Sequence, residues 1–115
     1  MQSLSRITPA TLDVLSVLVW SSEDLHGFAL AREAGRPTGS IYLILNRLEA
    51  TGWVDSYWET VNAQNEGRPR RRFYRLNPDG LTAARELLAE RRKNVASGIT
   101  GARRLSSGTR PQLRT

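Results

Sequence analysis

The chain has 115 residues, no cysteine and a formal net charge of +6 at pH 7. This length accommodates one domain with a modest hydrophobic core, which oligomerisation would supplement. Without cysteine the sequence excludes disulfides, thiolate metal sites and cysteine nucleophiles, and no apolar run approaches the roughly 20 residues that cross a membrane. Residues 1–6 also lack the basic and apolar regions of a signal peptide, so we expect a cytoplasmic protein with no membrane partner.

The positive charge is concentrated in two segments of the chain. Residues 66–75 contain five arginines and one acid, and residues 96–115 contain four arginines and no acid. Two concentrated basic segments on a nearly neutral body favour a polyanionic partner such as nucleic acid. The alternative, arginine used only for solubility, explains the second segment better than the first.

The first predicted element is a largely buried helix over residues 9–20. Thr8 is suited to be its N-cap and Pro9 its first helical residue, and apolar residues follow at helical spacing. Because the helix is apolar over much of its circumference, we expect it to be covered on two sides, by its own domain and by a second subunit. Residues 22–27 are predicted to form a turn after it.

A helix-turn-helix is predicted next. A short helix over residues 28–34 precedes Gly35, which is suited to the left-handed position at a helix C-terminus, and Pro37 prevents immediate helical continuation. The following helix is predicted to begin near Thr38, whose hydroxyl can cap it, and to end at Gly52. Two short helices joined by a tight turn, the second with a polar outer face, are typical of DNA-binding proteins.

This third helix is predicted to have one apolar face and one polar face that is poor in acids. Its apolar residues follow the i, i+3, i+4, i+7 spacing of a helix packed on a core, and they are Ile41, Ile44, Leu45 and Leu48. The polar face carries Tyr42, Asn46 and Arg47, whose side chains suit base edges and phosphates in a major groove. The alternatives are a face that serves only solubility and, for Tyr42, a tyrosine at the edge of the core.

A β-hairpin is predicted after the third helix. Residues 53–58 and 70–76 are rich in aromatic and β-branched or alternating residues, and the polar segment 59–69 between them ends in Gly-Arg-Pro, which is typical of a loop. A hairpin directly after a helix-turn-helix is a wing. The predicted fold class is therefore mainly α with a small β-hairpin (α+β): a three-helix core, a two-stranded wing and a C-terminal helix.

The wing arginines are the strongest individual candidates for DNA contact. Arg68, Arg70 and Arg71 lie in or directly after the Gly-Arg-Pro tip, which is too poor in apolar groups to pack, so their charges must meet solvent or phosphate. The strand residues 72–75 are expected to support the hairpin, with one of their two aromatic side chains in the core.

The last predicted helix starts at Asn77 and Pro78, which are suited to cap and begin it, and runs to about residue 95. Its apolar stripe extends beyond what a small winged domain can cover, so we expect it to pack on the same helix of another subunit; the alternative is an amphipathic helix on a monomer. From Ser97 onward the composition predicts a flexible tail. The expected units are a DNA-binding domain (1–76), a dimerisation helix (77–96) and a flexible basic tail (97–115).

As an ordered set, these features resemble the PadR family of winged helix-turn-helix transcriptional regulators. The motifs that carry the resemblance are LHGFAL from Leu25, GSIYLILNRLE from Gly39, GWV from Gly52, YWE from Tyr57 and EGRPRRRFYRL from Glu66, with Asp79-Gly80 after them. The resemblance covers about residues 9–95. It implies a homodimer that binds a roughly palindromic operator on double-stranded DNA and usually represses transcription, with dimerisation through the first and last helices.

Residue roles carried over by position follow from this resemblance. It assigns DNA contacts to Ser40, Tyr42 and Asn46 of the third helix and to the wing arginines. The full set of candidate DNA-binding residues is Thr38, Ser40, Tyr42, Asn46, Arg47, Arg68, Arg70 and Arg71. The candidate dimer-interface residues are Leu12, Leu15, Leu81, Ala84, Leu87, Leu88, Arg91 and Val95. The sequence differs from the family at Leu43, where proline is frequent, and at Asn46, where a basic residue is common.

The tryptophans and the histidine are candidates for other roles. Trp20, Trp53 and Trp58 are expected to pack in the core or the hairpin; since some family members bind flat aromatic effectors between subunits, Trp20 is also a candidate to line a pocket for an unidentified effector. His26 is the only histidine and is expected to cap a helix or form a turn rather than bind metal. No cofactor, metal site or catalytic motif is predicted, so we do not expect an enzyme.

The predicted function is that of a sequence-specific DNA-binding transcriptional regulator, with two alternatives from other classes. A non-regulatory DNA-architectural or mobile-element accessory protein is favoured slightly by the basic tail. A winged-helix protein-interaction module would be favoured by an acidic or apolar face on the third helix, and the face predicted here is neither.

Overall fold

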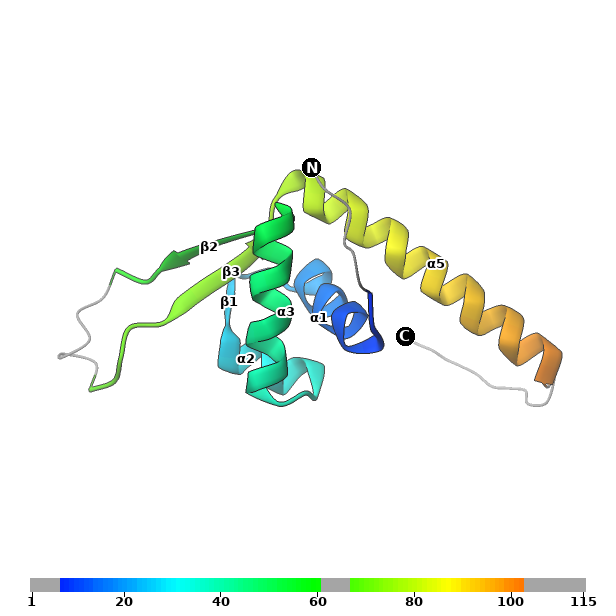
Figure 1. Cartoon of the computed structure of the whole chain (residues 1–115), viewed down its shortest axis with the longest axis horizontal. Coiled ribbons are helices and arrows are strands. Elements are labelled where there is room, and N and C mark those ends of the chain that lie inside the picture. The colour runs from blue at the N-terminus through cyan, green and yellow to red at the C-terminus, as the bar shows by residue number, and fades with distance from the viewer. Residues whose placement is uncertain (1–6, 61–66, 103–115) are drawn as a thin grey trace.

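The computed structural model describes residues 7–60 and 67–102 (Figure 1). In chain order its elements are α1 (Pro9–Trp20), β1 (Leu25–His26), α2 (Gly27–Ala34), α3 (Thr38–Thr51), β2 (Val54–Trp58), β3 (Arg72–Leu76) and α5 (Pro78–Ala102). Figure 1 shows α1, α2 and α3 grouped at the centre, with β2 and β3 extending from them on one side and α5 on the other. The predicted mixture of helices with a small antiparallel hairpin is confirmed. Within the described ranges, no helix is both long and apolar enough to cross a membrane.

Side-chain caps begin three of the helices as the sequence predicted. Thr8 caps α1 by accepting a hydrogen bond from the Thr11 backbone N–H at 3.1 Å, and Asn77 Oδ1 accepts from the Gly80 N–H at 2.8 Å at the start of α5. His26 caps α2 with its ring Nδ1. Each cap satisfies a backbone donor that the first helical turn leaves without an intrahelical partner.

The predicted cap of the third helix was wrong. Pro37 is the N-cap residue of α3, and no side chain caps the helix there. Thr38 is already the first helical residue, so its hydroxyl lies one position too far along the chain to act as the cap. The backbone carbonyl of Pro37 instead accepts from the Ile41 N–H at 3.1 Å. At the other ends of α2 and α3, Gly35 and Gly52 have φ of 68° and 89°. The predicted left-handed position of Gly35 and the predicted end of the third helix at Gly52 are confirmed.

The sheet has one strand more than the sequence predicted. Leu25 and His26, expected to lie in a turn, form β1 and pair antiparallel with β3, so the strand order is β1-β3-β2. The predicted hairpin of β2 and β3 is confirmed, in a register from Val54 opposite Leu76 to Trp58 opposite Arg72. A two-residue strand is too short to show an alternating pattern, and it exists because the fold brings it beside β3.

The hydrophobic core lies between α1, α2, α3, the sheet and the first half of α5. The predicted apolar face of α3 is confirmed, since Ile41, Ile44, Leu45 and Leu48 are all buried. The other core residues include Val14, Leu15, Leu30, Trp53, Val54, Tyr74 and Ala84. Burying each large apolar side chain of this kind stabilises the fold by roughly 1.5–3 kcal/mol, so the position of α3 is fixed by the core and not by its outer face.

Helix α5 packs on α1 and then continues away from the core (Figure 1). Its beginning approaches the sheet so closely that a Cβ at Gly80 would collide with the backbone of Trp53, which requires glycine at this position. The helix extends past its predicted end near residue 95 to Ala102. The remainder of the predicted basic tail, residues 103–115, lies outside the described residues, as does residue range 61–66 of the predicted wing loop.

Candidate nucleic-acid interface

The outer face of α3 is exposed along most of its length. Tyr42, Leu43, Asn46 and Arg47 are exposed, and Thr38 and Ser40 are half-buried at the N-terminal end of the helix. None of these residues is acidic, and the opposite face of the helix is packed in the core. A rigid helix with such a face has the chemistry to meet the edges of base pairs and the backbone phosphates of a major groove.

Tyr42 is exposed on the outer face of α3 and also contacts the neighbouring helix α2. Its side chain is 38% exposed, yet its ring lies directly over Gly27 at the start of α2, where an added Cβ would collide with the ring atoms. Gly27 is buried as a result. The contact holds the tyrosine ring in place while its exposed part faces outward. Sequence reasoning did not identify Gly27, although a glycine directly after the helix-capping histidine was a signal for a close approach.

Arg68 is held by an acidic residue at the base of the wing. The Glu59 carboxylate accepts hydrogen bonds from the Arg68 guanidinium and, at 2.9 Å, from the Arg71 backbone N–H. The hydrogen bond from Arg68 is the main reason that the pKa of Glu59 lies below its ordinary value, so this carboxylate stays ionised. Glu59 therefore closes the wing loop across its base. Sequence reasoning missed it, because an acid in a polar loop carries no local signal.

Arg70 and Arg72 both lie over the ring of Trp58. Their guanidinium carbons are 5.7 Å and 5.3 Å from the ring centroid, which is cation–π geometry. Arg70 is exposed, whereas Arg72 also donates to Glu49 of α3 at 3.4 Å. Glu49 in turn accepts from Ser56 of β2 at 2.5 Å. The two strands are thus connected to the C-terminal part of α3, and Arg70 is presented on the outer side of that assembly.

A concavity of about 410 Å³ lies between the wing and the helix-turn-helix. Its lining includes four arginines, 68 and 70–72, together with the rings of His26, Phe28, Tyr42 and Trp58, and none of the described residues that line it is acidic. Phe28 is 62% exposed beside it. The structure therefore brings the predicted wing arginines next to Tyr42 of α3. The combined surface is cationic and aromatic, which suits a sugar–phosphate backbone.

His26 has a structural role beneath this surface. Its Nδ1 accepts a hydrogen bond from the Ala29 N–H at 3.3 Å, and its ring meets Phe73 edge-on at 5.6 Å between centroids. Burial, followed by the nearby charges of Arg71 and Arg32, lowers the pKa of His26 below its ordinary value. The neutral ring that accepts the capping hydrogen bond is therefore the stable form. The predicted capping role is confirmed.

The candidate dimer-interface residues fall into two groups in the single chain. Leu15, Ala84 and Leu88 are buried in the chain's own core, and Arg91 is paired with Asp13 of α1. Val95 is 53% exposed, and Leu12, Leu81 and Leu87 are half-buried. Some of the candidate residues on α1 and α5 are therefore buried in the chain's own core, and others remain accessible.

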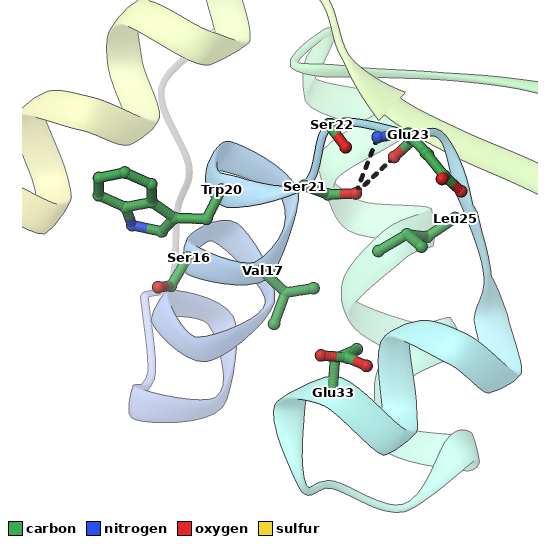
Figure 2. A pocket seen from close by; sticks show the side chains of 8 residues that line it. All are labelled: Ser16, Val17, Trp20, Ser21, Ser22, Glu23, Leu25 and Glu33. Atoms are coloured by element: carbon green, nitrogen blue, oxygen red, sulfur yellow. Dashed lines mark hydrogen bonds between the residues drawn. The ribbon is translucent and has the colours of Figure 1, made fainter. Parts of the chain in front are cut away.

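Trp20 is at the end of α1 and is 79% exposed, so the expectation that it packs in the core was wrong for the single chain. Of the other two tryptophans, Trp53 is buried in the core and Trp58 is part of the hairpin, as expected. Trp20 borders a concavity of about 490 Å³ that is also lined by residues of the following turn and by Glu33 of α2. Figure 2 shows its indole ring extending from α1 on the side away from Glu33. Trp20 also borders a second hollow of about 290 Å³ against α5. Among the described residues, no group of three or more metal-binding side chains is present.

Comparison with solved structures finds winged-helix regulators. PcaV, a transcriptional regulator from Streptomyces coelicolor whose structure is in complex with its natural ligand, superposes with a TM-score of 0.71 at 20% identity, over 87% of this chain and 66% of that chain. BpsR from Bordetella bronchiseptica superposes with a TM-score of 0.69 at 15% identity, over 87% of this chain and 66% of that one. The chain thus spans just under two thirds of the length of these two proteins. Among curated proteins, none matches the chain significantly.

Two findings concern the family itself. A PadR family transcription regulator from Clostridium difficile R20291 superposes with a TM-score of 0.60 at 24% identity, over 78% of this chain and 95% of that chain. The sequence profile of the transcriptional regulator PadR-like family matches residues 14–86, which contain the helix-turn-helix, the sheet and the beginning of α5. The resemblance inferred from the motifs is confirmed. The chain belongs to the PadR-like family of DNA-binding transcriptional regulators.

Proposed function

We propose that the protein is a sequence-specific repressor that binds a roughly palindromic operator as a homodimer. The observation that carries the proposal is the exposed, acid-free face of α3 beside a concavity lined by arginines. In this arrangement α3 enters the major groove, where Tyr42, Asn46 and Arg47 meet base edges and phosphates. Arg70, exposed over Trp58, meets the phosphates that flank the groove.

The homodimer is supported by apolar side chains that the single chain leaves uncovered on α1 and α5. Since Leu15, Ala84 and Leu88 are used by the chain's own core, the proposed interface narrows to the residues that remain accessible, which are Leu12, Leu81, Leu87 and Val95. Two copies packed through such a surface are related by a twofold axis. The two recognition helices then match the two halves of a palindromic site, about one helical turn apart.

The proposal also includes a small-molecule effector. The PcaV structure contains that protein's natural ligand, and DNA binding by BpsR is regulated by 6-hydroxynicotinic acid. In the present chain the exposed Trp20 borders two hollows, one of which lies against α5, so a flat aromatic ligand bound near the dimer interface would contact its indole ring. Such a ligand should quench the fluorescence of the wild-type protein and should leave that of Trp20→Phe largely unchanged.

The experiment that tests the proposal is a titration of fluorescently labelled duplexes at two salt concentrations. One duplex is the region upstream of the protein's own gene and the other has a random sequence; wild type is compared with Tyr42→Ala, with circular dichroism to verify that the variant is folded. Wild type should bind the upstream duplex about a thousandfold more tightly than the random one, with one dimer per site, and Tyr42→Ala should remove most of that difference.

The other outcomes favour the two alternative functions. Equal binding of both duplexes, with affinity that depends only on salt, would contradict a regulator and favour an architectural DNA-binding protein. The absence of binding to either duplex would contradict both DNA-binding functions and favour a protein-interaction module.

A further inference from the structure

A single carboxylate connects α1 with α5 and with the turn between α2 and α3. Asp13 of α1 accepts hydrogen bonds from Arg36 Nε at 3.1 Å and Nη2 at 2.7 Å with its Oδ2 atom. Its Oδ1 atom accepts from Arg91 Nη1 of α5 at 3.0 Å. The two carboxylate oxygens are thus each used by a different arginine, one on either side of α1.

The two arginines belong to the parts of the molecule that the proposed function must coordinate. Arg36 is in the turn of the helix-turn-helix, directly before the N-cap Pro37 of α3, and its backbone N–H donates to the Ala31 carbonyl at 3.0 Å. Arg91 follows the buried Leu88 on α5, where the helix leaves the core. Asp13 therefore links the start of the recognition helix with the helix proposed to form the dimer.

The link depends on the charge of Asp13. Its side chain is 27% exposed, and the side chains of both arginines are 36% exposed. Burial tends to raise the pKa of Asp13, but the hydrogen bonds from Arg36 and Arg91 outweigh it and lower the pKa below its ordinary value. Within the described part of the chain, no other acid lies within ion-pair distance of either arginine. Without this carboxylate, two guanidinium groups would remain close together without a counter-charge.

From this arrangement we infer that Asp13 is a positioning residue that fixes the angle between α5 and α3, and thereby selects the spacing between the two half-sites of the operator. The inference rests on the proposed homodimer. In a dimer formed through α5, the separation of the two α3 helices depends on how rigidly each is oriented relative to its own α5. Half-site spacing in helix-turn-helix dimers follows from that separation.

The test measures preference for spacing apart from affinity for a half-site. A half-site is first selected by the wild-type protein from a random duplex library. The affinities of wild type, Asp13→Asn and the control Glu90→Gln are then measured for that half-site alone and for inverted repeats of it whose spacers differ by single base pairs. Glu90→Gln removes the same charge from an exposed position of α5 that neighbours Arg91. Sedimentation measures the monomer–dimer equilibrium of each variant.

Wild type and Glu90→Gln should show a sharp optimum in spacer length. Asp13→Asn should bind the lone half-site and form dimers as wild type does, but its preference for the optimal spacer should fall about tenfold, as expected when directly interacting charged groups lose their coupling. Arg91→Gln, which leaves the Asp13–Arg36 pair in place, should flatten the profile in the same way. It serves as the test if Asp13→Asn does not fold.

An unchanged spacer profile in Asp13→Asn, or in Arg91→Gln if that variant is needed, would overturn the inference and leave the proposed function intact. An equal loss of affinity for every duplex, including the lone half-site, would also overturn it, because Asp13 would then act only through general stability. A wild-type protein that shows no spacer preference would overturn the inference and the homodimeric operator-binding function together.

Discussion

The α3–wing side and the α1–α5 side of the chain expose residues of opposite character. Around α3 the exposed groups are, apart from Leu43, polar, cationic or aromatic, and the concavity next to Tyr42 is lined by arginines. Along α1 and α5 the exposed groups include the large apolar side chains of Trp20 and Val95. Binding at the first surface should depend on salt and binding at the second on protein concentration. DNA binding and assembly should therefore be separable by mutation.

The largest expected effect is a loss of stability that distinguishes buried from half-buried residues on the α1–α5 side. Leu15→Ala removes a fully buried side chain from α1 and should lower the free energy of unfolding by roughly 3 kcal/mol, because the transferred apolar groups and the remaining cavity both cost stability. The measurement is chemical denaturation. Leu12→Ala, the same substitution at a half-buried position one turn earlier, should cost clearly less; an equal loss would show that both positions belong to one buried core.

The next largest expected effect is on the formation of the dimer alone. Val95→Asp places a charge at an exposed apolar position of α5 and should raise the dimer dissociation constant about tenfold, since a charge would be buried at the interface. Analytical ultracentrifugation measures this constant. Asn94→Asp adds the same charge at the neighbouring exposed position and is the control. An unchanged dimer in Val95→Asp would exclude this end of α5 from the interface.

A smaller effect is expected on the DNA-facing side. Arg70→Ala removes the exposed wing guanidinium that lies over Trp58 and should reduce the slope of log affinity against log salt by about 0.9 for each protomer, because one phosphate contact is lost. Titrations at several salt concentrations provide the slope. Lys93→Ala removes one positive charge from α5 and should leave the slope nearly unchanged. If both variants behaved alike, net charge rather than a wing contact would control binding.

The smallest predicted effect is a pH dependence of stability that comes from His26, the cap of α2. Because the pKa of His26 is lower in the folded state than its ordinary value of 6.5, the unfolded chain binds the proton more readily. The stabilisation that the neutral His26 ring provides is complete above pH 6.5 and is lost as the pH falls toward the folded-state pKa. Denaturation at pH 7.5 and pH 5.5 should thus show a loss of stability in wild type. His26→Asn, which keeps a capping side chain without a titrating ring, should show a smaller loss, and an identical loss would rule out His26 as the cause.

Local sequence signals were sufficient to predict most elements of the fold. The helix starts at Thr8 and Asn77, the stops at Gly35 and Gly52 and the buried face of α3 all depend on residues within one or two turns. The strand at Leu25 and His26 was missed because its pairing partners are Tyr74 and Phe73 in β3. The hydroxyl of Thr38 was assigned to a cap because the exact start of a helix after proline depends on backbone geometry that the sequence pattern does not specify.

The DNA-facing residues of the candidate site could be predicted from the sequence, but the residues that hold them in place could not. Tyr42, Asn46 and the wing arginines follow from the polar face and the loop composition. Glu59, which holds Arg68, and Gly27, which supports Tyr42, act through contacts between separate elements. The Asp13 link joins positions that are 23 and 78 residues apart in the chain, so only the folded arrangement reveals it. On α5, a helical stripe alone does not distinguish residues that face the chain's own core from those left for a partner.

The central claim is that α3 reads the base sequence while the wing binds phosphates. The most direct test is the ratio of affinities for the upstream duplex and a random duplex, measured in wild type, Asn46→Ala and Arg70→Ala under the same salt conditions. Asn46→Ala should lower this ratio about tenfold, since an amide contact to a base edge discriminates by roughly that amount, whereas Arg70→Ala should weaken binding to both duplexes and leave the ratio unchanged. A ratio that falls in Arg70→Ala and persists in Asn46→Ala would contradict this assignment of the two elements.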